Sequence, residues 1–225
     1  MGAVEPGADT RARLLAAAAA CFAARGFHGT TIREIADRAG VNVAAGHYHV
    51  GSKRELYLAV LREQFALVRE RLRASGADVD PAELAGLSRP ALQALLERRL
   101  QAMLVFLLGP PPSVHGTLMQ REMCDPSDAL PVIIDEFVEP FTAELSGLIA
   151  RLAPELSAVD VERTTLSILG QSLFYRFAMP IVQARWGAWS PELARSIAAH
   201  IAAFSEGGIA HLRRAKRRTR RTRGG

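Results

Sequence analysis

The apolar residues near the start of the chain recur at the spacing of one face of an α-helix. Leu14, Ala18 and Phe22 follow one another at intervals of four residues, and Leu15 lies beside Leu14 at i+3 spacing to Ala18. This spacing predicts an amphipathic helix over residues 10–25. Gly26 follows directly and is suited to end it.

The same periodicity continues along the rest of the chain, whereas the alternation of apolar and polar β-branched residues that marks a strand is absent. The sequence GPPPS at 109–113 ends one helix sharply, because proline cannot continue an α-helix. The predicted fold class is therefore all-α. Besides 10–25, helices are predicted over residues 31–39, 43–50, 53–75, 89–108, 114–124, 128–152, 161–179 and 191–214, with a loop over 76–88.

Residues 31–50 have the proportions of a helix-turn-helix. Thr31 and Glu34 have the spacing of a capping box, which starts the first of its two helices. Gly40 can supply a left-handed turn, and Val41 can fill the space between the helices. The outer face of the second helix would then be free to enter the major groove of DNA.

That second helix contains small residues first and hydrogen-bonding residues afterwards. Gly46 costs roughly 1 kcal/mol relative to alanine, which a short helix braced by its neighbours can absorb. Small side chains let the backbone approach base edges, and histidine and tyrosine suit phosphate oxygens or bases. Lys53 begins the next helix, where its charge and the helix N-terminus both favour a phosphate. The candidate DNA contacts are Asn42, Val43, Ala44, Ala45, His47, Tyr48, His49 and Lys53.

Charge is distributed unevenly along the chain. Residues 1–54 carry seven basic and four acidic side chains, residues 55–212 carry thirteen and nineteen, and residues 213–225 carry eight and none. An acidic body between two basic ends suggests that the ends bind a polyanion. For the last segment, extra attraction to phosphate and a dispensable solvated terminus are equally good interpretations.

Several classes of protein are excluded. No run of about 18 apolar residues exists, and the first residues lack the basic region of a signal peptide, so a cytoplasmic protein without membrane contact is expected. Cys21 and Cys124 are interpreted as reduced core thiols, with an oxidation sensor as the alternative. His47 and His49 lie about 200° apart on a helix and cannot share a metal ion there. No nucleophile elbow or phosphate-binding loop is present, so no catalytic residue, metal, cofactor or enzyme activity is expected.

The runs FAARGF, TTIREIADRAGV, YHVGSK and LYLAV, between residues 10 and 60, together resemble the DNA-binding domain of the TetR family of bacterial transcriptional regulators. The resemblance implies that Thr31 and Arg33 face DNA from the first helix of the motif. It implies that His49 and Lys53 contact phosphates and that Tyr48 touches the DNA backbone. The base-reading face would then be Val43, Ala44, Ala45 and His47.

The remainder of the chain resembles the CecR-like branch of this family through QREMCDPSDALPVIIDEFVEPF and GQSLFYRFAMP. That resemblance implies an all-helical, dimeric C-terminal domain with a pocket for a small-molecule effector. Each aromatic or methionine side chain considered singly is more often part of a plain core than of a pocket, and the polar candidates could equally be ordinary surface or cap residues. The candidate effector contacts are Phe106, His115, Met119, Gln120, Met123, Phe137, Phe141, Gln171, Phe174 and Phe177.

The sequence thus predicts a ligand-released repressor that binds a palindromic double-stranded DNA operator as a homodimer. Its predicted segments are a disordered N-terminus over 1–9, a DNA-binding domain over 10–57, an effector-binding and dimerisation domain over 58–212, and a basic tail over 213–225 that is disordered, or helical only where it continues the last helix. The dimer is expected to form through the last two long helices. The alternative is an effector-independent, sequence-nonspecific, nucleoid-type DNA-binding protein driven by its basic ends. An enzyme and a helical bundle without a DNA role are more distant alternatives.

Overall fold

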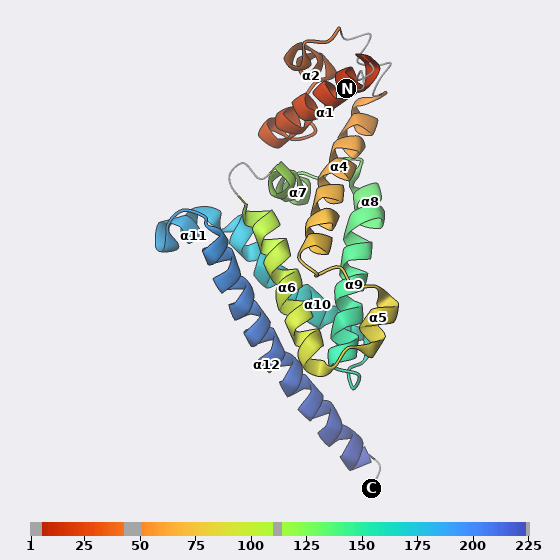
Figure 1. Cartoon of the computed structure of the whole chain (residues 1–225), viewed down its shortest axis with the longest axis vertical. Helices are drawn as coiled ribbons and strands as arrows, with labels where there is room; N and C mark the ends of the chain where they lie inside the picture. Colours follow the sequence, from red (N-terminus) through yellow and green to blue (C-terminus); the bar gives the residue numbers. More distant parts are fainter. Residues whose placement is uncertain (1–5, 43–50, 110–113, 224–225) are drawn as a thin grey trace. The chain divides into compact units, whose positions relative to one another are not determined.

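A computed structural model describes residues 6–42, 51–109 and 114–223, and every regular element in these ranges is a helix (Figure 1). The predicted all-α fold class is confirmed. The chain divides into two compact units. Unit 1 comprises residues 1–67 and 112–136, and unit 2 comprises residues 68–111 and 137–225.

Unit 1 is built on α1 (Pro6–Arg25), which packs against α2 (Ile32–Ala39) and α7 (Val114–Cys124). It also contains α8 (Leu130–Ile133) and the larger part of α4 (Lys53–Ala74). Its core includes Phe22 from α1 and Tyr57 from α4, whose rings meet edge to face with centroids 4.9 Å apart.

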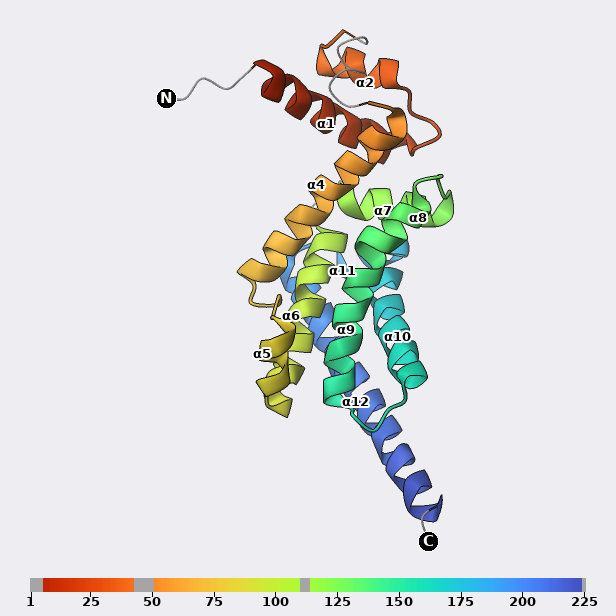
Figure 2. The same cartoon turned by 90° about the vertical axis from the view of Figure 1, so that its right-hand side faces the viewer.

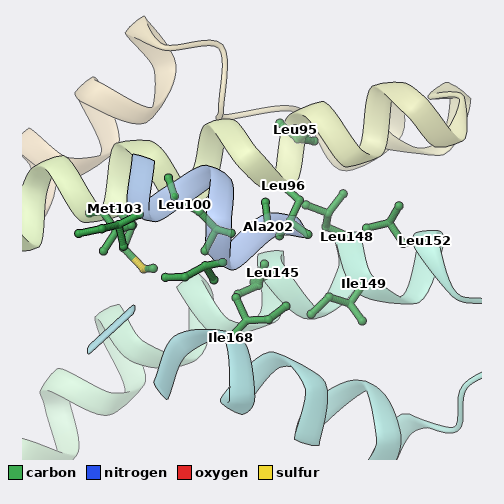
Figure 3. Close-up of a cluster of buried hydrophobic side chains, with 14 of the residues drawn as sticks. Leu95, Leu96, Leu100, Met103, Leu145, Leu148, Ile149, Leu152, Ile168 and Ala202 are labelled. Carbon is green, nitrogen blue, oxygen red and sulfur yellow. The ribbon is translucent and has the colours of Figure 1, made fainter. Parts of the chain in front are cut away.

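Unit 2 is a bundle in which α6 (Arg89–Leu108) packs against α9 (Glu139–Leu152), α10 (Ala158–Phe177) and α12 (Pro191–Arg223), as Figures 1 and 2 show. Two short helices, α5 (Pro81–Gly86) and α11 (Met179–Trp186), complete it. The buried side chains between the long helices are almost all aliphatic (Figure 3). They include Leu95, Leu96, Leu100, Met103, Leu145, Leu148, Ile149, Leu152, Ile168 and Ala202.

The helix bounds agree with the sequence prediction where local signals are strong. The bounds of α6 and α7 are those predicted, and α4 ends one residue early. The predicted helix over 43–50 lies outside the described residues. The predicted loop over 76–88 contains α5, and the predicted helix over 128–152 is divided by a π-helix, Ile134–Val138, between α8 and α9.

Helix reaches into both terminal segments for which disorder was predicted. Helix α1 already begins at Pro6, and α12 continues to Arg223, which agrees with the alternative that the basic tail is helical where it continues the last helix. The physical reason at the C-terminal end is that Arg213, Lys216 and Arg217 are held by carboxylates of the bundle. None of the described helices is long and apolar enough to cross a membrane.

The division into units also differs from the predicted domain boundary between residues 57 and 58. The boundary within α4 falls after Leu67, and residues 112–136 group with the N-terminal residues instead of with the helical body. The contacts of α7 with α1 explain this grouping, and they join residues about 100 positions apart, which periodicity does not reveal.

Candidate nucleic-acid interface

The start of α2 is fixed by the predicted capping box. The Thr31 hydroxyl accepts a hydrogen bond from the Glu34 backbone N–H at 3.3 Å, and Glu34 Oε2 accepts one from the Thr31 backbone N–H at 2.9 Å. Arg25 at the end of α1 adds an ion pair to Glu34 at 2.9 Å. The hydrogen bonds from Thr31, with help from Arg25, lower the pKa of the Glu34 carboxyl. The first turn of α2 is therefore set at a defined position on α1.

The end of α2 is fixed by Gly40 and by an arginine that the sequence prediction missed. Gly40 has φ 64° and ψ 39°, the left-handed conformation predicted for it. Arg13 on α1 donates from Nε to the Ala39 carbonyl at 3.1 Å and from Nη2 to the Gly40 carbonyl at 3.0 Å. The last carbonyls of a helix lack partners within it, so a cation placed there stabilises the helix end. Helix α2 is thus held on α1 at both ends.

The two faces of α2 separate structural residues from candidate contacts. Ile35, Ala36 and Ala39 are buried against the unit core. Thr31 and Arg33 are exposed, as is Asn42 beyond the glycine turn. Three candidate DNA contacts are therefore accessible. The other predicted base-reading and phosphate-binding residues, Val43, Ala44, Ala45, His47, Tyr48 and His49, lie outside the described residues.

A second capping box begins α4. The Ser52 hydroxyl accepts from the Glu55 backbone N–H at 3.2 Å, and Glu55 Oε2 accepts from the Ser52 backbone N–H at 2.7 Å. Lys53 follows, and its Nζ lies 4.5 Å from the centre of the Phe27 ring, a cation–π contact that the sequence did not suggest. The ammonium group of Lys53 is consequently positioned by the half-buried Phe27 ring of unit 1.

Helix α7 supports the candidate interface through buried polar contacts. Arg121 donates to the carbonyl oxygens of Ala23 at 2.8 Å and of Ala24 at 2.5 Å, which completes the C-terminus of α1. The buried Glu122 carboxylate accepts a hydrogen bond from the Tyr57 hydroxyl at 2.9 Å. Its other oxygen accepts two bonds from Ser127, each at 2.9 Å.

These contacts tie α1, α4 and α7 together inside unit 1. Sequence reasoning missed Glu122, since its partner Tyr57 is 65 residues away. Burial and the neighbouring Glu122 carboxylate raise the pKa of Tyr57 above its ordinary range. The phenol therefore stays protonated and remains a hydrogen-bond donor.

The candidate effector residues are distributed over both units. His115, Met119, Gln120 and Met123 lie on α7 in unit 1. His115 is buried edge-on against Phe65, with ring centres 4.6 Å apart, and burial lowers its pKa to about 3. Met119 and Gln120 are half-buried, whereas Met123 is exposed. Of the two cysteines, Cys21 is buried as predicted, and Cys124 is exposed, so its interpretation as a core thiol is wrong.

The remaining candidates belong to unit 2. Phe106 on α6 and Gln171 on α10 are half-buried, and Gln171 donates to the Ser167 carbonyl of its own helix at 3.2 Å. Phe137 is buried, whereas Phe174 and Phe177 are exposed on α10. Phe141 is the one candidate that lines a small cavity of about 10 Å³ beside Arg99, which holds no more than one water molecule. The cavity is lined by Leu72, Arg99, Leu100, Met103, Phe141, Glu144 and Leu145.

A helix capped at both ends, the exposed Asn42 after its glycine turn and a second capped helix at Lys53 are the described parts of a DNA-binding domain of the helix-turn-helix class, joined here to a helical body. Comparison with known proteins narrows the class. Residues 14–60 match the family of bacterial regulatory proteins called the tetR family, and residues 92–209 match the C-terminal domain of the HTH-type transcriptional dual regulator CecR. The chain belongs to the TetR family of transcriptional regulators, in the branch with the CecR-type C-terminal domain.

Individual relatives agree with this assignment. The dual regulator CecR of Shigella flexneri is 29% identical over 200 residues, which cover 83% of this chain and 85% of that protein. FadR of Bacillus subtilis in complex with stearoyl-CoA superposes with a TM-score of 0.65 at 13% identity, over 88% of this chain and 98% of that one. AibR in complex with isovaleryl coenzyme A and operator DNA superposes with a TM-score of 0.63 at 17% identity, over 87% of this chain and 97% of that one. Because their sequence identity to this chain is low, these two superpositions show that the fold is shared and nothing more.

Proposed function

We propose that this transcriptional regulator is a ligand-released repressor that binds a palindromic operator as a homodimer. The observation that carries the proposal is that α2 is held on α1 at both ends, by the capping box at Thr31 and by Arg13 at the Ala39 and Gly40 carbonyls, while a second capping box at Ser52 fixes the start of α4. Selection of bound sequences from a random pool of DNA duplexes tests it. A palindrome with half-sites about 34–36 Å apart, or a multiple of that distance, is expected. Enrichment of no sequence would refute operator recognition.

The exposed residues of α2 allow a matched test of the DNA-facing side. Arg33 and Arg38 are both exposed on α2, five residues apart and so on different faces. We expect Arg33→Ala to weaken operator binding and to lower the salt slope by about 1, as the removal of one phosphate-binding cation does. Arg38→Ala removes the same charge and serves as the control. Equal effects of the two changes would contradict the proposed orientation of α2.

The exposed apolar side chains of α10 and α12 support dimerisation with a second copy. Val159, Leu166, Phe174 and Phe177 follow one face of α10, and Phe204 of α12 is 65% exposed. Gly207 and Gly208 lie one turn further along α12, where an added Cβ would meet nothing within 4 Å. Each glycine costs a helix roughly 1 kcal/mol, and close approach of a partner helix offsets such a cost.

A charge placed on this face should separate the subunits. We expect Phe204→Glu to convert the dimer into a monomer in sedimentation equilibrium, because the new carboxylate would be buried without a partner. Ala150→Glu adds the same charge at an exposed position of α9 and is the control. A wild-type chain that stays monomeric at micromolar concentration would refute the dimer.

The effector is proposed to be a small, largely apolar molecule bound in the helical body. Relatives with this fold have been seen with coenzyme A thioesters, stearoyl-CoA in FadR and isovaleryl-CoA in AibR. Acyl-CoA thioesters are therefore the first probes. The cavity beside Arg99 and Phe141 is far smaller than such a ligand, so binding requires these helices to separate.

Release requires that the effector favour the state that does not bind DNA. A ligand with equal affinity for both states shifts nothing, however tightly it binds. Operator affinity is therefore measured while an acyl-CoA known to bind the chain is titrated. A falling affinity is expected. An unchanged operator affinity at saturating ligand would refute the release step.

A further inference from the structure

Helix α12 continues well beyond the core that its first part covers. Ile209 is the last residue of α12 with a buried apolar side chain, yet the helix extends fourteen residues further, to Arg223. Residues 213–223 contain seven arginines and one lysine, no acidic residue, and only Ala215 among the apolar types. This segment is called the basic end of α12 below. Eight like charges on an isolated helix repel one another, so the bundle must compensate some of them.

Two carboxylates of the bundle provide this compensation on one side of the helix. Glu155, after α9, accepts from Arg213 at 2.8 and 3.0 Å and from Arg217 at 2.8 and 2.5 Å. Asp160, in the first turn of α10, pairs with Lys216 at 2.6 Å. Both carboxylates are largely shielded, with side chains 13% and 19% exposed. They fix the rotation of the basic end about its own axis.

The other side of the basic end carries cations towards solvent. Arg214 and Arg218 are exposed and lie one turn apart, about 6 Å along the helix axis. Arg214 follows Arg213 by one residue and therefore points about 100° away from it. A surface hollow of about 290 Å³ lies along this side, and its lining is entirely cationic or neutral. The lining residues are His211, Arg214, Ala215, Arg217 and Arg218.

We infer that the basic end of α12 is a second, sequence-independent binding surface for double-stranded DNA, in addition to the helix-turn-helix. A guanidinium group forms paired hydrogen bonds with phosphate oxygens, and seven of the eight cations are arginines. A helix that binds a membrane surface needs an apolar face, which residues 213–223 lack. A duplex presents one phosphate charge per about 1.7 Å of its axis, a density that suits a row of exposed arginines.

The test compares the full-length wild type with two charge-matched double variants. Arg214→Gln with Arg218→Gln removes two exposed cations and leaves the partners of Glu155 and Asp160 in place. Arg69→Gln with Arg71→Gln removes two exposed arginines of α4 and is the control. Binding to a fluorescent duplex of unrelated sequence is measured by anisotropy between about 50 and 200 mM salt.

The expected result is a smaller salt slope for the first variant alone, by up to about 0.9 for each phosphate that the variant no longer neutralises. At about 0.1 M salt, one such phosphate corresponds to roughly an eightfold change in affinity. Arg214→Lys with Arg218→Lys keeps both charges and should retain most of the slope, which separates an effect of charge from an effect of structure. A slope equal to that of the wild type in the glutamine variant would overturn the inference.

The same variants distinguish DNA from two other possible partners of the basic end, and they distinguish this inference from the operator proposal. Stronger binding to an RNA duplex than to DNA would overturn the inference. So would binding to vesicles with about one-third anionic lipid, if the glutamine variant has the same salt slope for DNA as the wild type. Preference for the selected operator over unrelated DNA should be equal in the wild type and the glutamine variant. Loss of preference in every variant, wild type included, would count against operator recognition and not against the basic end.

Discussion

The hydrogen bond between Tyr57 and Glu122 offers the sharpest test of how unit 1 is held together. Tyr57→Phe removes one hydroxyl and keeps the ring, which packs against Phe22 at 4.9 Å and Phe27 at 5.1 Å. The hydrogen bond is 2.9 Å long and joins two buried side chains, Tyr57 being 1% and Glu122 2% exposed. Water cannot replace the missing donor at such a site without a change in structure.

The expected loss of stability in Tyr57→Phe follows from the charge of the hydrogen-bond acceptor, Glu122. A hydrogen bond to a charged group contributes about 1.5–3 kcal/mol, and Ser127 supplies only the opposite carboxylate oxygen of Glu122. We therefore expect Tyr57→Phe to destabilise unit 1 by about 2 kcal/mol. Since 1.4 kcal/mol is a factor of ten, amides protected by opening of this unit should exchange roughly thirtyfold faster.

Hydrogen exchange followed by mass spectrometry measures this effect locally. Peptides from α4 and α7 should exchange faster, whereas peptides from α9 and α10 in unit 2 provide an internal reference. Tyr57→Phe is then also made in the Glu122→Gln variant, in which the hydrogen-bond acceptor is neutral. In that background the loss of stability caused by removing the hydroxyl should be smaller by at least about 1 kcal/mol. An equal cost in both backgrounds would show that the bond to the carboxylate is not its source.

Three further predictions concern individual contacts. Thr31→Ala should cost about 1 kcal/mol in thermal or urea unfolding, whereas Thr31→Ser should keep the cap; equal losses would contradict the capping role. Gly40→Ala should cost about 1–2 kcal/mol, because φ is 64° and the new Cβ would lie 3.0 Å from Arg13 Nη2, whereas Gly147→Ala in open space on α9 should cause no loss. The pKa values of Glu155 and Asp160 are lowered to about 2, chiefly by hydrogen bonds from Arg213 and Lys216 respectively. Their contribution to stability is therefore complete above their ordinary pKa values and is lost as the pH falls from about 4 to about 2. Helical circular dichroism should fall in that range in the wild type and not in Glu155→Gln with Asp160→Asn.

Local sequence signals predicted the parts of the fold that local interactions determine. The capping residues Thr31 and Glu34 and the left-handed Gly40 are each specified within a few positions of the chain, and all three are confirmed. The bounds of α6 and α7 follow from apolar periodicity and from the prolines at 110–112, and they too are confirmed. Such features require no knowledge of tertiary packing.

The features that were missed depend on partners far away in the sequence. The basic end of α12 is a helix because of Glu155 and Asp160, more than fifty residues earlier. Residues 112–136 join unit 1 through Arg121 and Glu122, whose partners on α1 and α4 precede them by 65 residues or more. Among the candidate DNA contacts, Lys53 was placed correctly at a helix start, but its Phe27 contact was not foreseen. The effector candidates remain a prediction, since aromatic residues at helical spacing do not distinguish a pocket from a core.

The π-helix at Ile134–Val138 has a consequence for how this region tolerates changes in length. A turn closed by an i to i+5 hydrogen bond contains one residue more than an α-helical turn. One surplus residue is thereby accommodated at the point where the chain passes from unit 1 to unit 2. Natural variants one residue shorter here could close an ordinary α-turn and still present the apolar side of α9 to α6. The loss of one residue from Ile134–Val138 is therefore compatible with an unaltered packing of the bundle.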